Sequence, residues 1–582
     1  MDQISFLLLT VLPEEITMQC EAFRWPEQQT LILDFYQAFD SSNCMNRLRD
    51  FFSAPLDKDY LLAAENICNH GLYSIPPYGL IQFQSMIDWQ GDSSTKRGFS
   101  RLLHAHFFIK NLIEAFKYTN NSLYLSKGYE IIEDWIVKNT FRNAINPMAW
   151  HDETTARRLI TWIAFFDEAR KILTQEKLAF LFSHIKKHAE LLGTDKFYSK
   201  NTNHGMFQDQ ALIVYSDYFS FLEGSKELKL LACSRLKEYF DVIFSKEGVH
   251  LEHSPYYHSL IANKLLSYSH YFQDLDDSFG DYLIEKYYRA AAFATYIIKP
   301  DGLLPQIGDT QSIKPGNQLW KDNPVYQYAK TQGRKGQPPE ENDIVFPEAG
   351  YAIFRDSWAK KELSTYVMFT AAYHTNYHKH SDDLSLWIYA RGSDILVESG
   401  PDGYNKDEFS NYCYSSFAHN VLIVDHKGLP RTDGKYFATK IVDYLLTPDK
   451  PIVTGITERY KGIKHTRVIE YDKLNQIITV SDNISSSDEH TYQLLWHLAP
   501  KIEAIIDGKD HITLKKENTC IMNIEVKGDQ ELSISKVKGQ LEPFMLGWYF
   551  RKFEEKEPIY TLVFECQGKD VNICTDFILS SP

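Results

Sequence analysis

Residues 374–404 read HTNYHKHSDDLSLWIYARGSDILVESGPDGY, and residues 418–425 read AHNVLIVD. Both stretches contain short runs of aliphatic, aromatic and β-branched residues bounded by Gly, Asp or Asn, a pattern typical of β-strands. Runs of the same kind recur from Tyr351 onward at intervals of roughly ten to twenty residues, namely YVMFT, LSLWIYA, DILVE, NVLIVD, IVTGI, RVIEY, QIITVSD, YQLLWHL and YTLVFE. This succession predicts an antiparallel β-sandwich in the second half of the chain.

The first half of the chain has a helical period instead. Apolar residues recur there at the spacing of one helix face, in the sets Leu102, Ala105, Ile109, Leu112 and Phe116; Leu159, Trp162, Ile163 and Phe166; and Leu212, Tyr215, Phe219 and Leu222. Turn-rich segments separate the sets, namely TNNS from Thr119, KNTFRNAINP from Lys138 and GTDKFYSKNTNHG from Gly193. A run of helix pairs of this kind is what a helical toroid or solenoid requires.

Two polar segments with Gly and Pro, KPGNQLWKDNP and TQGRKGQPPEEND, lie between these halves and are typical of linkers and loops. We therefore predict a helical domain over residues 1–310, a linker over 311–345 and a β-sandwich domain over 346–582. A chain of 582 residues is too long for a single domain, which agrees with this division.

The composition limits the class of function. The chain is 44% hydrophobic and 24% charged, as globular proteins are, and its net charge of −15 disfavours nucleic acid as a partner. An acidic enzyme can still concentrate positive potential around a polyanionic substrate. Aromatic residues reach 14%, a surplus that fits either a core or a cleft in which rings stack on sugars.

The cysteines and the N-terminus bear on the compartment. Eight cysteines are scattered without a CxxC motif, so we expect free thiols. The apolar run Ile4–Leu12 has no basic leader, so we interpret it as the start of a folded helix, and no run is long enough to span a membrane. For the sequence as given we expect a cytoplasmic protein, or a periplasmic one if a leader has been removed.

Histidines concentrate in the opening stretch. His378-x-His380 resembles part of a strand, and alternation would place both side chains on one face. Glu398 ends the next apolar run and His419 opens another. Two imidazoles with a carboxylate and a further imidazole fit a zinc site, or a hydrogen-bonded polar cluster where two domains meet. Asp382 and Asp383 are alternative ligands or outer partners of such a site.

Three further motifs have both a structural and a functional interpretation. Asn203-His204-Gly205 precedes a helix, where Asn is a good cap. Residues 248–258 read GVHLEHSPYYH, in which Ser-Pro starts a helix and the tyrosines either pack or transfer protons. A proton-transferring tyrosine needs a lowered pKa, which nearby positive charge provides. Residues 304–310 read LPQIGDT and are interpreted as a structural loop that lines a cleft.

These motifs together resemble the heparinase II/III-like polysaccharide lyases over nearly the whole chain. The matching pieces in the first half are Ile87-Asp88-Trp89, Glu133-Asp134-Trp135, Ala149-Trp150, Ala156-Arg157-Arg158-Leu159, Asn203-His204-Gly205, Glu252-His253-Ser254-Pro255-Tyr256-Tyr257-His258 and Ile307-Gly308-Asp309. Those in the second half are Glu348-Ala349-Gly350-Tyr351-Ala352-Ile353-Phe354-Arg355, His378-Lys379-His380-Ser381-Asp382 and His419-Asn420. The resemblance implies an α+β multidomain fold, with an incomplete (α/α) toroid followed by an antiparallel β-sandwich.

The resemblance also implies β-elimination on acidic polysaccharides that contain uronic acid. Asn203 and His204 match the residues that neutralise the uronate carboxylate, Tyr257 matches the catalytic tyrosine, and His378 matches the sandwich histidine that reaches into the cleft. His380, Glu398 and His419 match the zinc ligands of part of the family, which more often has Asp at the position of Glu398. Further substrate contacts are expected at Trp89, Trp150, Arg157, Arg158 and Glu252.

The chemistry of elimination agrees with these residue types. Neutralising the carboxylate stabilises the charge that develops when the C5 proton leaves, and we predict that Asn203, His204, Tyr257 and His378 converge on one cleft. A syn elimination can use Tyr257 as base and acid, whereas an anti elimination needs two groups, so the base is Tyr257 or His378. A zinc ion in the sandwich would be structural.

Two rival functions stay open at this stage. A glycoside hydrolase would need two cleft carboxylates; Asp152, Glu153 and Glu252 are candidates, but no pair stands out. A non-catalytic protein that binds acidic glycans is the second rival. The sequence does not indicate which uronate polymer is the substrate, or the oligomeric state.

Overall fold

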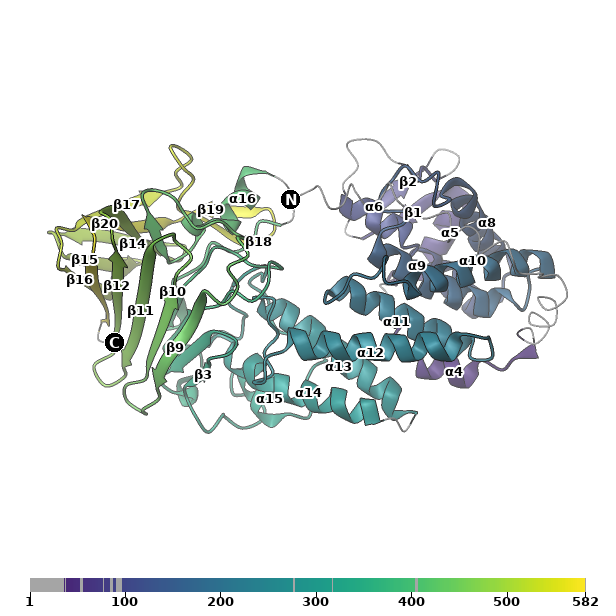
Figure 1. The fold of residues 1–582 in the computed structure, drawn as a ribbon, viewed down its shortest axis with the longest axis horizontal. Helices are drawn as coiled ribbons and strands as arrows, with labels where there is room; N and C mark the ends of the chain where they lie inside the picture. The colour runs from purple at the N-terminus through teal and green to yellow at the C-terminus, as the bar shows by residue number, and fades with distance from the viewer. Residues whose placement is uncertain are drawn as a thin grey trace. The chain divides into compact units, whose positions relative to one another are not determined.

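The computed structural model describes residues 36, 38–52, 56–76, 78–83, 87–90, 97–275, 278–316, 318–403 and 407–580. The helix predicted at Ile4–Leu12 lies outside these residues. The chain divides into two compact units, Met1–Phe240 and Asp241–Pro582, called here the first and the second unit. In sequence order, a helical region precedes a region of antiparallel strands, which confirms the predicted fold class (Figure 1).

Helices form nearly all of the described part of the first unit. They are α4 (Ser42–Arg47), α5 (Tyr60–His70), α6 (Arg97–His104), α7 (Ile109–Thr119), α8 (Leu123–Lys138), α9 (Asp152–Ala169), α10 (Gln175–Gly193), α11 (Asn203–Tyr218) and α12 (Ser225–Ile243), and the division between the units falls within α12. One short hairpin, β1 (Leu72–Ser74) with β2 (Leu80–Gln82), accompanies them.

The predicted breaks between helices coincide with their observed ends. Helix α7 ends at Thr119, where Asn120 adopts the left-handed backbone with φ +55°, and α10 ends at Gly193. The apolar set from Leu102 to Phe116, however, belongs to two helices rather than one. Helix α6 ends before His106, whose φ of +61° interrupts the helical backbone, and α7 begins afresh at Ile109.

The centre of the first unit is formed by α9 and α11, which pack against each other (Figure 1). Both helices are buried over most of their length, so neither has a wide polar face. A helix that is buried almost all round belongs to the core. The core therefore holds the first turns of both helices in place. Both first turns carry polar side chains, Asp152 and Glu153 in α9 and Asn203 and His204 in α11.

The second unit begins with helices and continues with strands. Its helices are α13 (Pro255–Gln273), α14 (Ser278–Tyr296), α15 (Pro324–Lys330) and α16 (Glu408–Tyr414), with short 3₁₀ turns at Trp358–Leu363 and Ser416–Ala418. Helices α13 and α14 pack as a pair. The predicted linker, residues 311–345, contains α15 and the start of the first strand of this unit.

Three antiparallel sheets form the body of the second unit. The first contains β3 (Ile344–Phe346), β4 (Tyr351–Arg355), β5 (Tyr366–Thr370), β6 (Ser385–Ala390) and β7 (Ser393–Leu396). The second has the order β14 (Ile502–Asp507), β15 (His511–Lys516), β16 (Thr519–Gly528), β21 (Val571–Leu579), β12 (Ile477–Ser486), β11 (Ile463–Asp472), β10 (Ile452–Thr457) and β9 (Thr439–Leu445). The third has the order β17 (Ser533–Lys538), β20 (Tyr560–Gly568), β13 (His490–His497) and β8 (Leu422–Val424), and β18 (Trp548–Lys552) pairs with β19 (Glu555–Pro558).

These sheets stack as a sandwich. The eight-stranded sheet contacts the four-stranded sheet through Trp496 and Phe577, whose ring centroids lie 5.2 Å apart. It contacts the five-stranded sheet at Gly455, where a Cβ atom would lie 2.6 Å from the ring of Phe369. A bridge between Leu396 and Leu498 joins the two smaller sheets into one layer. Burial alternates along β11 and β12, as expected for strands with one face on a core.

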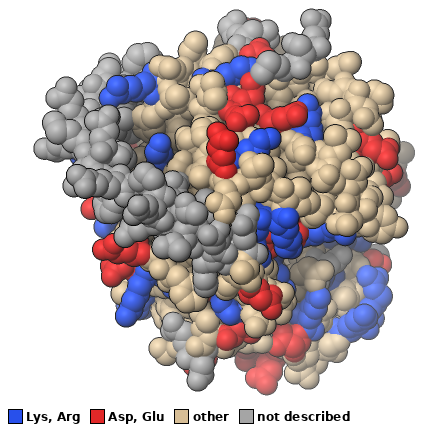
Figure 2. All heavy atoms as spheres, turned by 90° about the vertical axis from the view of Figure 1, so that its right-hand side faces the viewer, with Lys and Arg blue, Asp and Glu red and all other residues tan. Residues whose placement is uncertain are grey.

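The distribution of surface charge and the state of the cysteines can both be read from the structure. On the face drawn in Figure 2, acidic and basic side chains are interspersed among uncharged ones. Every cysteine among the described residues is a free thiol, as predicted. Among those residues, no helix combines the length and the apolar character that crossing a membrane requires.

Candidate active site

Helix α11 of the first unit carries Asn203 and His204 at its start. Thr202 caps the helix, because its hydroxyl accepts a hydrogen bond from the backbone N–H of Gly205 at 3.1 Å. A Cβ atom at Gly205 would lie 2.4 Å from the carbonyl oxygen of Ser199, so only glycine lets the preceding loop approach this turn. The Asn-His-Gly motif is thus a tightly packed helix start with two polar side chains.

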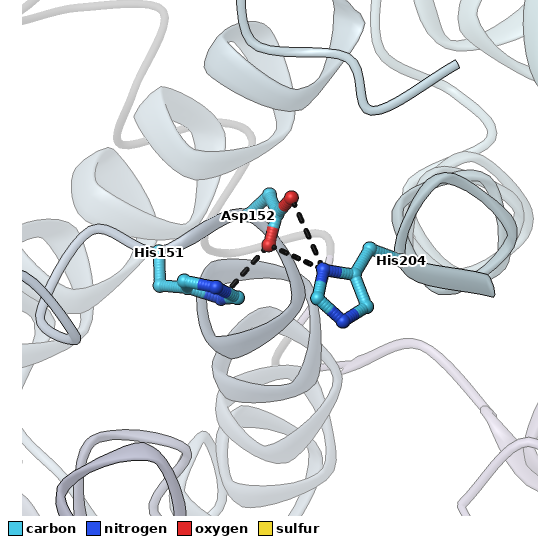
Figure 3. Close-up of side chains that lie close together, drawn as sticks. All are labelled: His151, Asp152 and His204. Carbon is cyan, nitrogen blue, oxygen red and sulfur yellow. Dashed lines mark hydrogen bonds and ion pairs between the residues drawn. The ribbon is translucent and has the colours of Figure 1, made fainter. Parts of the chain in front are cut away.

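His204 belongs to a cluster with His151 and Asp152 (Figure 3). Asp152 is the first residue of α9, and its Oδ1 lies 3.1 Å from His204 Nδ1 and 2.8 Å from His151 Nδ1. Ser199 donates its hydroxyl to the other oxygen of Asp152. Three groups therefore surround a single carboxylate, and one of them is the predicted carboxylate-binding histidine.

A second carboxylate faces the other nitrogen of His204. Glu153 Oε2 lies 3.6 Å from His204 Nε2. Glu153 is itself paired with Arg157 at 2.7 Å and with Arg101 at 3.1 Å. The imidazole of His204 is thus placed between Asp152 and Glu153, and the two arginines balance part of the negative charge.

The pKa directions follow from this arrangement. For both carboxyl groups burial acts to raise the pKa, but the partners outweigh it: hydrogen bonds from His151 and His204 lower the pKa of Asp152, and Arg157 and Arg101 lower that of Glu153. Burial acts to lower the pKa of His204, but the hydrogen bond and charge of Asp152, together with Glu153, raise it above its usual value. The cluster therefore favours an imidazolium between two ionised carboxylates.

The same cluster has the composition of a metal site. Among the described residues, His151, Asp152 and His204 are the group whose donor atoms all lie within 4.8 Å of one another. However, Asp152 and His204 lie in the first turns of α9 and α11, where the helix dipoles are positive and favour an anion over a cation. The helix starts therefore favour the ionised form of Asp152 over a bound metal ion, and binding of an anionic substrate group by His204 stays a prediction.

The other predicted substrate contacts of this unit differ in burial. Trp89 and Arg158 are 1% and 0% exposed, and Arg158 lies 3.8 Å from the ring centroid of Trp135 inside the helix packing. Arg157 and Trp150 keep part of their surface exposed. Burial places Trp89 and Arg158 among the residues that support the helices, and direct contact of any of the four with a glycan stays a prediction.

In the second unit, the structure brings Tyr257 and His378 together. Tyr257 is the third residue of α13, whose cap Ser254 accepts a hydrogen bond from the backbone N–H of Tyr257 at 3.4 Å. The rings of Tyr257 and His378 stack with their centroids 3.5 Å apart. Glu252, a predicted substrate contact, is buried with its Oε2 3.5 Å from His378 Nε2. A phenol and an imidazole in contact are suited to transferring protons.

The strand predicted for His378-x-His380 is wrong. Residues 371–384 form a loop between β5 and β6, and His378 has a left-handed φ of +52°. The loop is fixed by Lys379, which is fully buried and paired with Asp382 and Asp383, the two alternative metal ligands. The buried ion pairs of Lys379 therefore fix a loop here instead of a strand. The same pairs give Asp382 and Asp383 the ammonium group of Lys379 as their positive partner.

His378 and His380 nevertheless share a partner, Asp309. Asp309 Oδ2 lies 2.6 Å from His378 Nδ1, and its Oδ1 lies 3.0 Å from His380 Nε2. Burial acts to raise the pKa of this carboxyl group, but the hydrogen bonds from the two histidines outweigh it and hold the pKa below its usual range. The sequence interpretation assigned residues 304–310 to a structural loop that lines a cleft, and it gave Asp309 no role beyond its place in a matching motif.

Two of the three predicted zinc ligands are in direct contact. His419 Nδ1 contacts Glu398, and Ser385 donates its hydroxyl to the same carboxylate. His419 Nε2 lies 3.1 Å from the carbonyl oxygen of Cys413 and must donate to it, since a carbonyl only accepts. A neutral His419 would then direct the lone pair of Nδ1 at a carboxylate, so this contact requires a cation or a proton between the two groups.

The third predicted ligand lies nearby. The ring centroids of His380 and His419 are 5.3 Å apart, and the bond from His380 Nε2 to Asp309 leaves Nδ1 as the second ring nitrogen. Two imidazoles and a carboxylate are a donor set that zinc accepts. Unlike the donor atoms of His151, Asp152 and His204, those of His380, Glu398 and His419 do not all lie within 4.8 Å of one another. Zinc at this place therefore stays a prediction.

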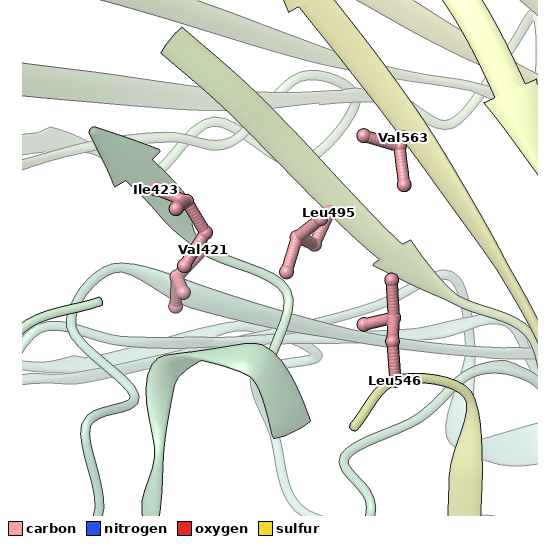
Figure 4. Close-up of a cluster of buried hydrophobic side chains, with 5 residues drawn as sticks. All are labelled: Val421, Ile423, Leu495, Leu546 and Val563. Carbon is pink, nitrogen blue, oxygen red and sulfur yellow. The ribbon is translucent and has the colours of Figure 1, made fainter. Parts of the chain in front are cut away.

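Strand β8 fixes the position of His419. The strand begins three residues after His419. Ile423 of this strand and the preceding Val421 pack with Leu495, Leu546 and Val563 in a buried apolar cluster (Figure 4). The next residue, Asn420, donates its side-chain amide to Leu386 O at 2.7 Å and Val397 O at 3.0 Å. The segment that carries His419 is therefore tied to β6 and to the end of β7, which leads to Glu398.

Comparisons with known proteins agree with this architecture. Residues 15–330 match the model of the heparinase II/III N-terminus, and residues 338–576 match that of the heparinase II/III-like C-terminal region. The chain belongs to the heparinase II/III-like polysaccharide lyase family. By this membership it is an enzyme of the polysaccharide lyase class.

Individual relatives of this family member are distant in sequence. It is 21% identical to a heparin-sulfate lyase of Bacteroides stercoris over 87% of this chain and 80% of the relative, and 20% identical to one of Pedobacter heparinus over 71% and 64%. A crystal structure of heparinase III matches with a TM-score of 0.74 and 15% identity, covering 98% of this chain and 94% of that one. A heparan sulfate lyase structure from Pedobacter heparinus matches with a TM-score of 0.68 and 16% identity, covering 98% and 91%. At such identities the structures support the fold alone.

Proposed function

We propose that this family member cleaves a uronic-acid-containing polysaccharide by β-elimination. The observation that carries the proposal is the stacked pair of Tyr257 and His378, a phenol and an imidazole in contact. Elimination requires a group that takes the proton from C5 and a group that protonates the departing O4. The pair supplies both kinds of group within one unit.

The cluster around His204 supplies the other requirement. Removing the weakly acidic C5 proton places negative charge on the adjacent carboxylate, and a fixed positive group stabilises that charge. We assign this role to His204, held as an imidazolium by Asp152 and Glu153, together with Asn203. The C5–H and C4–O4 bonds break, the pair of electrons from C5–H forms the C4=C5 double bond, and O4 takes up a proton. The product is an unsaturated uronate.

The assignment of base and acid depends on the substrate. If the C5 proton and O4 lie on the same face of the ring, Tyr257 can serve as base and then as acid. If they lie on opposite faces, His378 takes the proton and Tyr257 returns one to O4.

For the substrate we propose a heparan-sulfate-like polymer. The two curated relatives described above are named heparin-sulfate lyases, and both cover most of this chain. The fold does not fix the substrate. Chondroitin, hyaluronan, alginate and bacterial capsule polymers therefore belong in the test as competing substrates.

We further propose that His380, Glu398 and His419 hold one structural zinc ion. The support is the contact of His419 with Glu398, in which His419 Nε2 is already committed to a carbonyl oxygen. When bound, the ion would tie the loop that carries His378 to the strands that carry Glu398 and His419. The steps of the elimination remain with Tyr257, His378, Asn203 and His204.

A glycoside hydrolase fits the observations less well. Its general acid must hold a proton near neutral pH, which requires a raised pKa. The pKa values of Asp152 and Glu153, two of the three carboxylates considered for that role, are shifted downward by their partners. Both carboxylates are also committed to His204, Arg101 and Arg157.

A panel of uronate polymers tests the proposal. The purified enzyme is incubated with each polymer, and new reducing ends and near-ultraviolet absorbance are recorded together. A lyase produces both signals in parallel, with heparan sulfate expected to give the largest. Reducing ends without absorbance would identify a hydrolase, and retention of a polymer without either signal would identify a binding protein.

A further inference from the structure

Asp309 occupies an unusual position for a carboxylate. The residue is 4% exposed, and its carboxylate bridges the catalytic candidate His378 and the predicted zinc ligand His380. The two bonds use different oxygens and different ring positions, Nδ1 of His378 and Nε2 of His380. One buried group thus touches both functional histidines of the second unit.

The backbone around Asp309 is fixed on both sides. Gly308 has a φ of +51°, and a Cβ atom there would lie 2.5 Å from His253 O and 2.8 Å from His378 O, so only glycine allows this approach. On the other side, the Thr310 hydroxyl lies 2.7 Å from that of Ser254, the cap of the helix that carries Tyr257. Asp309 is therefore held between the segment of His378 and the helix of Tyr257.

The bridge dictates where the protons of both histidines lie. At neutral pH an aspartate carboxylate is ordinarily ionised, and an ionised carboxylate only accepts hydrogen bonds. His378 must then donate from Nδ1, and His380 must donate from Nε2. In their neutral forms, His378 keeps its lone pair on Nε2 and His380 keeps its lone pair on Nδ1.

We propose that Asp309 is a positioning residue that sets the tautomers of both histidines. It leaves Nε2 of His378, which faces Glu252 Oε2 at 3.5 Å, as the nitrogen for proton transfer, and Nδ1 of His380 as the nitrogen for metal. The role deepens the proposed function and rests on it. Asp309 is buried behind the histidines and acts through them, as outer partners of catalytic and metal-binding histidines do. Catalysis and metal retention thereby depend on one carboxylate.

Asp309→Asn is the sharpest substitution. Asparagine has nearly the same shape but offers one oxygen and one NH₂ group, so it can accept from one histidine and must donate to the other. One tautomer is therefore reversed. If the tautomer of His378 is reversed, we expect kcat to fall by about 100-fold or more, with little change in KM. We expect zinc affinity to fall by about 10–100-fold if His380 is reversed.

Asp301→Asn is the matched control. Asp301 accepts a hydrogen bond from Lys299 at 3.0 Å in the same unit and belongs to neither histidine bridge. Lys299 keeps a second carboxylate partner, Asp394, at 2.7 Å, so its charge stays paired. The same chemical change in the same unit is expected to leave kcat and zinc affinity near those of the parent.

Three measurements decide the proposal. They are kcat and KM on the polymer that the parent cleaves best, zinc affinity by competition with a chromophoric chelator, and ¹⁵N NMR of the histidine side chains, assigned with His378→Gln and His380→Gln. In the parent we expect Nδ1–H for His378 and Nε2–H for His380. The NMR measurement needs neither turnover nor a folded Asp309 variant, so it also separates this proposal from the proposed function.

Each outcome decides one point. The opposite tautomer at His378 or at His380 in the parent overturns the proposal for that residue. An Asp309→Asn enzyme with parental kcat and zinc affinity overturns it for both, as does an equal loss in Asp301→Asn. A parent that binds no zinc overturns the metal half. A parent that cleaves no uronate polymer but has the expected tautomers contradicts the proposed function and leaves the role of Asp309 supported.

Discussion

The phenol oxygen of Tyr257 is the most direct test of the chemistry. Tyr257→Phe removes one oxygen and preserves the stacking on His378. We expect the variant to fold and bind substrate while turnover falls by about 10²–10⁴-fold, the usual contribution of a general acid–base group. Initial rates of the rise in near-ultraviolet absorbance, which an unsaturated uronate product gives, would measure this. Tyr256→Phe, which changes the exposed neighbouring tyrosine, is the control. Near-parental turnover in Tyr257→Phe would assign the proton transfer to another residue.

A second residue-scale prediction concerns the charge on His204. Its raised pKa depends on Asp152, so Asp152→Asn is expected to lower that pKa. The imidazolium then deprotonates at a lower pH than in the parent, and the anionic substrate loses its positive partner. We expect KM to rise in the variant, and to rise more at pH 8 than at pH 6.

The sign of the linked stability can be checked in the same variant. A raised histidine pKa gives stability that is complete below the unfolded value of about 6.5 and is lost as the pH rises through the folded pKa. The thermal midpoint of the parent should therefore fall relative to Asp152→Asn on the alkaline side. Asp195→Asn, which changes a 97% exposed side chain, is the control. Equal pH dependence in parent and Asp152→Asn would contradict the assigned pairing.

At the scale of residues, the sequence identifies groups more readily than their partners. His378 and Tyr257 were predicted as proton-transfer candidates, and the structure places their rings in contact. The bridging role of Asp309 was missed because it lies 69 positions from His378 and no local pattern marks a bridging carboxylate. A local signal is the preceding Gly308, whose left-handed backbone brings the loop close to His378. Asp152 was considered only as a hydrolase carboxylate, since its contacts with His204 depend on the packing of α9 and α11.

At the scale of elements, periodicity predicts the type of structure well and its interruptions poorly. The β-rich runs RVIEY and QIITVSD correspond to β11 and β12, because alternation follows directly from one buried face. The apolar set from Leu102 to Phe116 spans two helices, since four residues between α6 and α7 preserve a helical spacing without a helical backbone. The strand predicted at His378 failed for a related reason: charge pairing around the buried Lys379 fixes a loop there.

One buried ion pair couples elements of the sandwich. Arg467 of β11 pairs with Asp482 of β12 at 2.7 Å, and both side chains are 0% exposed. Its Nη1 also donates to Leu384 O and to Asn420 O, each at 2.7 Å. The guanidinium thus connects the eight-stranded sheet with the segments that lead into β6 and follow His419.

Replacing this guanidinium is expected to be costly. Arg467→Met leaves Asp482 buried with a reduced set of partners and leaves two carbonyl groups without their donor. Breaking a buried pair from one side typically costs about 3–5 kcal/mol, and we expect that loss in the free energy of unfolding. Urea denaturation of the parent and the variant measures it. Lys464→Met, an exposed change on the same strand, should stay within about 0.5 kcal/mol of the parent.

At the scale of the whole molecule, the candidate chemistry is divided between the two units. The carboxylate-binding candidates Asn203 and His204 belong to the first unit, and Tyr257, His378 and the predicted zinc ligands belong to the second. The fold class was predictable because helical and strand periods occupy separate parts of the chain. The joint action of the two groups on one sugar stays a prediction, since neither periodicity nor the contacts within one unit determine it.

The predicted zinc provides a test that separates the units. If His380, Glu398 and His419 hold one ion, purified enzyme should contain one equivalent of zinc, and His419→Gln should remove it. An ion present at about 1,000 times its dissociation constant stabilises the folded state by about 4 kcal/mol. Chelation should therefore lower the thermal midpoint of the parent and leave that of His419→Gln unchanged.

Hydrogen–deuterium exchange locates the loss. The predicted ion ties the end of β7 and the start of β8 to the loop of His380, so removing zinc should raise exchange in residues 371–384 and 396–424. The starts of α9 and α11 carry the rival cluster of His151, Asp152 and His204, and they should exchange equally with and without zinc. Increased exchange there, with none around His419, would assign the ion to the first unit. That result would also mean that the charge on His204 is supplied by a metal rather than by a proton, because its Nδ1 can bind only one of them.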